Sequence, residues 1–228
     1  MQNYKMFFKN NLEKVFVALI LLIMVALAIL SNDSFIALVA ALCGIMYTYL
    51  AGKGVPNCYL FGVIGSCFYS YLSYQNSVWG HVLLYVLYFL PMQIIGYFRW
   101  NKNLQNGKKE IVKINLPKRE LYILIGISLI LILGSYIVLL NFNDKNPLLD
   151  SITSVLCLGG MYCTVRRSIE QWLFWLIVNS LSFVMWLGVA LAGTKVYSTS
   201  LMWGIYTFFA IYFYVLWSKD LKNQNYNK

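Results

Sequence analysis

One stretch of the sequence combines side chains that bind flat polar rings. Trp172, Trp175 and Asn179 follow W-x-x-W-x-x-x-N spacing, which places them at i, i+3 and i+7 on one stripe of a helix. Two indoles above one amide predict a slot for a flat polar ring. An aromatic face also attracts a cation, by up to about 2 kcal/mol when both groups are desolvated, so this slot needs no carboxylate to hold a positively charged ring.

A second polar position lies near the middle of the apolar run 82–100. Gln93 stands there, and an amide that faced lipid would be costly, so we expect it to face protein or a cavity. Tyr88 precedes it on the same run, and Pro91 removes a backbone hydrogen bond and predicts a local distortion. Two simpler explanations stay open: tryptophans such as Trp172 can form an interfacial belt, and buried amides can join helices.

The acidic and basic side chains offer no buried catalytic pair. All eight acids fall in loops or at the ends of apolar runs, and the single histidine, His81, opens one. The sequence has no Walker A pattern and no cysteine spacing typical of a metal site, so its five cysteines are expected to be buried free thiols. We therefore expect no catalytic residue, metal or cofactor, and passive, facilitated movement of a solute, because proton-driven carriers generally need a titratable group in the pathway.

The composition makes lipid the solvent for most of the chain. Of 228 residues, 60% are hydrophobic and 11% are charged, against roughly 25% charged in ordinary soluble domains. The net charge of +10 does not indicate a nucleic-acid partner, because the basic residues lie between apolar runs. A basic excess placed in this way is first of all a signal of membrane topology.

Eight apolar runs have about the length needed to cross a bilayer, close to 20 residues. The loops between them support this number. With the N-terminus inside, sixteen of the eighteen basic residues, all except Lys145 and Lys195, fall on one side, as the positive-inside rule predicts. We therefore expect an all-α, multi-pass protein of the bacterial inner membrane with both termini in the cytoplasm. The predicted spans are 15–30, 35–51, 58–74, 82–100, 121–140, 149–165, 172–192 and 198–217.

The first run also resembles a secretory signal, with Ala26-Leu27-Ala28 as a cleavage pattern. We favour an uncleaved helix, since a chain with many spans has little need of a removable signal. The polar tail 218–228 is expected to be disordered for lack of apolar residues.

A weak internal similarity predicts duplicated helix units. At an offset of 114 residues, Leu42-Cys43 matches Leu156-Cys157, and Phe61 and Gly65 fall on Trp175 and Asn179. With a helix between them, two three-helix units run parallel, and a binding site is expected between them near the bilayer midplane. The predicted organisation is a tail and first helix (1–33), a first three-helix repeat (34–100), a basic loop with a linker helix (101–147), a second repeat (148–217) and a tail (218–228).

Two stretches make a family resemblance specific. PMQIIGYFRW at 91–100, and RRSIEQWLFW at 166–175 with Asn179 beyond it, resemble the PnuC family of vitamin transporters, and the likeness runs from about residue 44 to 217. The resemblance implies a 3+1+3 bundle related to the SWEET sugar transporters, a homotrimer, and facilitated diffusion of nicotinamide riboside that a separate kinase traps inside the cell.

The same resemblance implies the ligand contacts. It places Trp172, Trp175, Asn179 and Gln93 around the ligand, with Phe61 as the first-repeat partner of Trp175; Tyr88 joins them from its place beside Gln93. Gly65 and Tyr85 depart from the family pattern, because many relatives carry amides at those positions.

Several alternatives remain open. Within the family, thiamine carries a flat cationic ring and riboflavin a large flat ring, so either can replace nicotinamide riboside as the substrate. Outside it, the chain can be a membrane-embedded enzyme of lipid or isoprenoid metabolism, although the lack of buried acids and phosphate-binding loops argues against this. A receptor that binds without transport is the third alternative.

Overall fold

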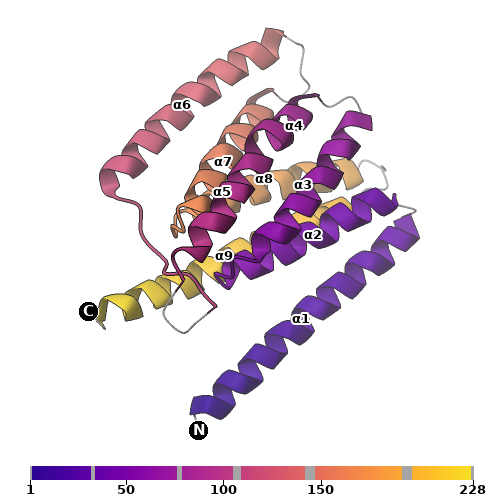
Figure 1. The fold of residues 1–228 in the computed structure, drawn as a ribbon. Coiled ribbons are helices and arrows are strands. Elements are labelled where there is room, and N and C mark those ends of the chain that lie inside the picture. Colours follow the sequence, from indigo (N-terminus) through magenta and orange to yellow (C-terminus); the bar gives the residue numbers. More distant parts are fainter. Residues whose placement is uncertain are drawn as a thin grey trace.

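The computed structural model is a bundle of long helices (Figure 1). It describes residues 2–31, 34–75, 79–104, 109–141, 147–191 and 197–226. The elements in chain order are α1 Gln2–Ser31, α2 Phe35–Gly52, α3 Cys58–Gln75, α4 Trp79–Leu84, η1 Tyr85–Phe89, α5 Leu90–Asn101, α6 Lys118–Asn141, α7 Pro147–Val165, α8 Gln171–Leu191 and α9 Tyr197–Tyr226.

The predicted apolar runs coincide with these helices. Five helices of the described chain are long and apolar enough to cross a membrane: α1, α2, α6, α7 and α9. Two more, α3 and α8, contain shorter apolar stretches, Cys58–Tyr71 and Gln171–Met185. The all-helical membrane class is thus confirmed, whereas the number of eight spans stays a prediction. The end of the predicted run 172–192, Ala192, lies outside the described residues. The expectation of a disordered tail is wrong for residues 218–226, because α9 continues through them to Tyr226.

The surface of the bundle supports lipid as its solvent. In α6 only 6% of the apolar window is buried, and Ile130 and Leu133 are 71% and 63% exposed. A soluble protein rarely leaves so large a contiguous apolar surface open to water. In α6 the apolar residues therefore serve contact with acyl chains more than packing within the protein.

The distortion expected at Pro91 takes the form of a π-helical turn. α4, η1 and α5 follow one another without a break, and within η1 the Leu90 N–H donates to the Tyr85 carbonyl, five residues back. Pro91 lacks the N–H that would bond the carbonyl four residues before it, and a π turn is one way a helix accommodates such a gap. Single π turns often occur at functional sites, and this one carries Tyr88.

The turns between α2 and α3 and between α7 and α8 have the same backbone hydrogen bonds. Bonds donated by residues 53, 54, 55, 58, 59 and 60 recur from residues 166, 167, 168, 171, 172 and 173, each with the matching acceptor. Both turns contain a left-handed residue, Gly54 at φ 71° and Arg167 at φ 64°. The two turns therefore match at an offset of 113 residues.

This offset corrects the register of 114 expected from the sequence, which was wrong by one residue. Phe61 corresponds to Phe174, and the position that corresponds to Trp175 is Gly62. Asn179 likewise corresponds to Ser66 instead of Gly65. The true register also aligns Leu60-Phe61 with Leu173-Phe174.

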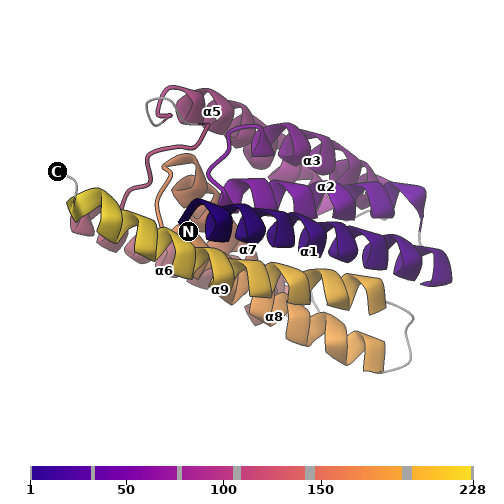
Figure 2. The same ribbon diagram turned by 90° about the horizontal axis from the view of Figure 1, so that it is seen from below.

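The helices form two sets that pack against each other through their end helices. We call α2, α3 and α4–α5 the first set, and α7, α8 and α9 the second. The last helix of each set packs on the first helix of the other, α5 on α7 and α9 on α2, and α6 packs on α7. α1 lies along α2 and α9 (Figure 2), where Glu13 forms an ion pair with Lys53 and accepts a hydrogen bond from the Tyr212 hydroxyl at 2.6 Å.

Both turns lie at one end of the bundle, which we call the basic end because it carries Lys53, Arg99, Arg166 and Arg167. The α5–α6 connection, residues 109–117, joins the two turns there. The Ile111 N–H donates to the Gly54 carbonyl at 2.9 Å, and the Ile114 N–H donates to the Arg167 carbonyl at 3.1 Å. The connection therefore bonds to corresponding positions of both sets.

Gly52 provides a test of the contact between α2 and α9. A Cβ at this position would lie 2.3 Å from the Phe213 ring, so Gly52→Ala forces the two helices apart. Overpacking of this kind costs roughly 1–3 kcal/mol, and we expect a lower thermal midpoint in detergent.

Gly126→Ala is the matched control. Nothing lies within 4 Å of a Cβ at Gly126, and alanine is favoured over glycine within a helix by up to about 1 kcal/mol. Equal midpoints for the two variants would contradict the packing of α9 on α2.

Candidate functional site

Trp175 lies flat against α7. Its indole N–H donates to the Thr164 hydroxyl at 3.1 Å, and that hydroxyl donates to the Gly160 carbonyl at 2.8 Å. A Cβ at Gly160 would lie 3.1 Å from the indole, so the glycine allows the ring to approach the helix backbone. Trp175 is half-buried. One edge of this aromatic plane is therefore fixed by a hydrogen bond, while part of its surface stays accessible.

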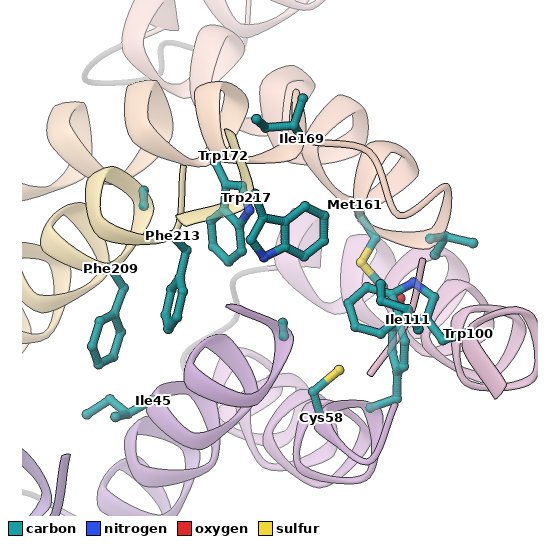
Figure 3. Close-up of a cluster of buried hydrophobic side chains, with 14 of the residues drawn as sticks. Ile45, Cys58, Trp100, Ile111, Met161, Ile169, Trp172, Phe209, Phe213 and Trp217 are labelled. Carbon is teal, nitrogen blue, oxygen red and sulfur yellow. The ribbon is translucent and has the colours of Figure 1, made fainter. Parts of the chain in front are cut away.

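Trp172 occupies a different environment. It is 2% exposed, its ring lies 5.3 Å from the ring of Phe213 and 5.7 Å from that of Trp217, and the Trp217 contact is edge-to-face (Figure 3). The buried indole N–H has no hydrogen-bond partner among the described residues. In this conformation Trp172 thus belongs to an aromatic cluster with α9 and does not share an open slot with Trp175.

The first set contains the counterpart of this cluster. Tyr59, which corresponds to Trp172, meets Trp100 edge-to-face at 5.1 Å and 81°, as Trp172 meets Trp217 at 5.7 Å and 81°. The Trp100 N–H donates to the Thr164 carbonyl at 2.9 Å, and the Trp217 N–H donates to the Gly52 carbonyl at 2.7 Å. We call these two bonds the tryptophan bridges; each joins the last helix of one set to the final turn of the first helix of the other.

Gln93 presents an unused acceptor inside the protein. It is 3% exposed, and its amide nitrogen donates to the Ser66 hydroxyl at 2.8 Å. Its side-chain oxygen is buried and has no partner within the described chain, and a Cβ at Gly62 would lie 2.9 Å from that oxygen. Buried polar atoms are normally paired, so this oxygen is available to a donor on a ligand.

A recess of about 120 Å³ lies beside Gln93, between α3 and α5. Leu60, Ile94 and Phe98 line it and are 53%, 52% and 60% exposed. The recess therefore opens toward lipid, and its volume is below the roughly 300 Å³ at which ligand pockets begin. We do not assign the solute to it.

Tyr47 is a site residue that the sequence analysis missed. Its ring lies 2.8 Å from where a Cβ at Gly62 would stand, and its hydroxyl points to the Met161 sulfur on α7 at 3.8 Å. Tyr47 therefore lies between the Gln93 side and the Trp175 side of the interior. The signal that could have identified it is the pair of glycines, Gly62 and Gly160, each of which receives a large ring.

The two sets exchange these large and small residues. At the offset of 113, Tyr47 corresponds to Gly160 and Gly62 corresponds to Trp175. In the first set the ring comes from α2 and covers a glycine of α3, whereas in the second the ring comes from α8 and covers a glycine of α7. The first set thus contributes a tyrosine from α2 and the second a tryptophan from α8, so the two rings differ in size and in the helix that carries them.

The remaining predicted residues are placed as follows. The Tyr88 hydroxyl donates to the Leu158 carbonyl at 2.7 Å, so Tyr88 and Trp175 both contact residues 158–164 of α7. Asn179 is 5% exposed and forms no hydrogen bond with the described part of the chain. Phe61 is half-buried on α3. No described contact joins Gln93 directly to Trp175 or Asn179.

The buried interior of the described residues carries a single charged side chain. Among the buried polar side chains of the described residues, Lys113 alone is charged, and it pairs with Asp220 at the basic end. No group of described His, Cys, Asp or Glu side chains could hold a metal ion. All five cysteines are free. The expectation that they are buried holds for Cys58 and Cys163, is met only in part by the half-buried Cys43 and Cys157, and is wrong for Cys67, which is exposed. Aromatic faces and amides remain as the groups that can bind a solute.

An all-helical, lipid-facing bundle whose described interior holds rings and amides but no buried carboxylate fits a multi-pass membrane transporter. The chain belongs to the nicotinamide mononucleotide transporter family, whose sequence model matches residues 34–219. The resemblance found in the sequence is thereby confirmed.

Known relatives match over nearly the whole chain. This chain is 30% identical to the nicotinamide riboside transporter PnuC of Neisseria mucosa, over 95% of this chain and 84% of that protein. It is 27% identical to the protein of the same name from Haemophilus influenzae, over 93% and 92%. The crystal structure of the vitamin B3 transporter PnuC superposes with a TM-score of 0.79 at 28% identity, covering 93% of this chain and 92% of that one.

The tryptophan bridges predict a specific loss of stability. Trp217→Phe keeps an aromatic ring near Trp172 but removes the donor to the Gly52 carbonyl, and an unsatisfied buried carbonyl costs roughly 1–3 kcal/mol. We expect a lower thermal midpoint of the purified protein.

Trp203→Phe serves as the comparison, because Trp203 is half-buried on the same helix and its indole N–H forms no hydrogen bond within the described chain. A loss as large in Trp203→Phe as in Trp217→Phe would argue that ring size, and not the hydrogen bond, matters.

Proposed function

We propose that this protein carries nicotinamide riboside across the bacterial inner membrane. The observation that carries the proposal is Trp175, an indole fixed against α7 in an interior where no carboxylate of the described residues is buried. Nicotinamide riboside bears its positive charge on a flat pyridinium ring, which an indole face attracts. The names of the relatives from Neisseria mucosa and Haemophilus influenzae support the same substrate.

The ligand contacts follow from the chemistry of each group. The pyridinium stacks on Trp175, and Asn179 and the unpaired Gln93 oxygen bond the carboxamide and the ribose hydroxyls, since amides both donate and accept hydrogen bonds. Tyr88 and Tyr47 form walls beside the ring. Phe61 lines the α3 side, and Trp172 completes the site when its contacts with α9 loosen.

The site lies between two parallel three-helix repeats, 34–100 and 148–217. The shared turn geometry at an offset of 113 and the reciprocal tryptophan bridges support this division. The segment 101–147 supplies the linker helix α6, so the plan is 3+1+3 as in SWEET transporters, with α1 of segment 1–33 added outside and a polar tail, 218–228, at the end. Rocking of one repeat against the other exposes the site to each side in turn.

The basic end faces the cytoplasm. Its lysines and arginines follow the positive-inside rule, and α1 begins and α9 ends toward that side (Figure 2). Transport is facilitated diffusion; net uptake then depends on a separate cytoplasmic kinase that phosphorylates the vitamin, because an added phosphate removes it from the transport equilibrium. The protein works as a homotrimer, as the family resemblance implies.

Isothermal titration with nicotinamide riboside tests the site. Loss of a desolvated cation–π contact of up to about 2 kcal/mol corresponds to roughly thirtyfold weaker binding, so we expect that loss in Trp175→Ala. In Trp175→Phe, which keeps an aromatic face but loses the bond to Thr164, we expect a smaller one. Unchanged affinity in Trp175→Ala would sink the assignment of this residue.

Parallel titrations with thiamine and riboflavin separate the rival substrates. A preference for thiamine, whose thiazolium is also a flat cation, or for riboflavin would keep the site and change the vitamin. Binding without flux in proteoliposomes would instead support a receptor.

Flux measurements test the mechanism. Because the described interior has no buried acid, we expect nicotinamide riboside to reach equal concentrations inside and outside proteoliposomes, at a rate that an imposed pH gradient does not change. Accumulation above the outside concentration, driven by that gradient, would overturn facilitated diffusion.

A further inference from the structure

Three arginines gather at the basic end beside the start of α6. Arg99 lies in the last turn of α5, and Arg166 and Arg167 form the turn between α7 and α8. Burial lowers the pKa of the Arg167 guanidinium below its usual value, and the charges of Arg99 and Arg166 lower it further. The bond from the Trp100 indole N–H to the Thr164 carbonyl places the end of α5, which carries Arg99, beside the turn that carries Arg166 and Arg167. None of the contacts described so far for transport uses these three cations.

Arg167 is held in a backbone conformation that favours glycine. Its φ is 64°, and the corresponding residue of the first set is Gly54, with φ 71°. A long side chain at positive φ is uncommon and costs free energy, and the first set shows that glycine makes the same turn. An arginine at this position thus indicates that its side chain has a use that compensates for the strain.

The nearby carboxylates do not balance the three charges. Glu120 pairs with Arg166 at 2.6 Å and also accepts a hydrogen bond from the Tyr162 hydroxyl. Glu170 accepts the Leu116 N–H at 3.1 Å. Arg99 forms no ion pair with any residue that the structure describes. The positive charge at this corner of the bundle therefore exceeds the negative charge.

The guanidinium groups also have unused donors. Arg167 donates through one terminal nitrogen to the Val112 carbonyl at 3.1 Å, but its Nε is buried and has no partner within the described chain. The Nε of Arg166 is likewise buried and unpaired. Buried donors that point at no protein acceptor indicate that an acceptor from outside the chain completes the cluster.

We propose that Arg99, Arg166 and Arg167 bind a phosphate group at the basic end of the bundle. Guanidinium groups are planar, stay charged and offer several parallel N–H donors, which suits the oxygens of phosphate better than a lone carboxylate. The phosphate comes from an anionic phospholipid or from a soluble phosphate ester. The lipid is favoured because α6 begins beside Arg166 and leaves Tyr122 and Ile123 69% and 52% exposed, an apolar surface along which acyl chains can lie.

Thermal unfolding in nanodiscs tests the proposal with the full-length protein. Neutral phosphatidylcholine discs are compared with discs that contain about one-third phosphatidylglycerol, and inorganic phosphate or nicotinamide mononucleotide is added separately to the neutral discs. Arg167→Gly is the main variant, since glycine already makes the corresponding turn in the first set, and Arg99→Gln is the second. Lys102→Gln is the matched control, an exposed cation one residue beyond α5.

We expect phosphatidylglycerol to raise the midpoint of the natural protein by roughly 3–6 °C, the shift that tenfold ligand excess over its dissociation constant gives for a chain of this size. Arg167→Gly and Arg99→Gln should lose at least half of this shift, whereas Lys102→Gln should keep it. If inorganic phosphate or nicotinamide mononucleotide gives these shifts and phosphatidylglycerol gives none, the arginines still bind phosphate, but the ligand is a soluble phosphate ester. No shift in the natural protein, or an equal shift in all three variants, would overturn the proposal.

Discussion

The structure depends on how two helices end. A backbone carbonyl in the last turn of a helix has no partner within that helix, and in or near a membrane few waters are available to replace one. Here the final turns of α2 and α7 each place a carbonyl, those of Gly52 and Thr164, within reach of an indole N–H from the opposite set. The Thr164 carbonyl also accepts the Arg167 N–H at 2.9 Å, so the requirement is stricter at Gly52. Meeting this requirement joins the two sets, and it also fixes the neighbours of both tryptophans, Tyr59 and Trp172. The Trp217 bond to the Gly52 carbonyl also requires α9 to lie close to α2, and the missing side chain at Gly52 leaves room there for the Phe213 ring.

The proposed recognition of the solute uses weak, uncharged groups. A carboxylate buried there would bind a cationic ring more strongly, but it would carry a large desolvation cost whenever the site was empty. An indole and two amides avoid that cost. The lysines and arginines of the described residues lie at one end, which the positive-inside rule predicts to face the cytoplasm. Three arginines lie around the turn at Arg167 there. Charge and recognition are thus separated along the length of the bundle.

Much of the fold could be predicted from the sequence, because hydropathy alone locates helices that must face lipid. The polar positions Gln93 and Asn179 were also predicted as buried, since an amide in an apolar run has few other places to go. Two features could not be found in this way. The register was wrong by one residue because Tyr47 with Gly62 and Gly160 with Trp175 exchange large and small residues, which hides the alignment. The packing of Trp172 against Phe213 depends on a helix forty residues away, about which spacing on α8 carries no information.

The exchange of Tyr47 and Gly62 for Gly160 and Trp175 has a consequence for any molecule held between the two sets. A cage with two equal halves would accept a flat ligand in either of two poses related by the symmetry axis. The bound ligand would then be a mixture of two orientations, and it would leave the site in either one unless it rotated first. With the larger aromatic plane on α8 and the unpaired amide oxygen on α5, the two poses would differ in energy and one would be favoured. A solute held in this proposed site would keep its ring toward the same half of the protein, so a single set of contacts would serve both entry and exit.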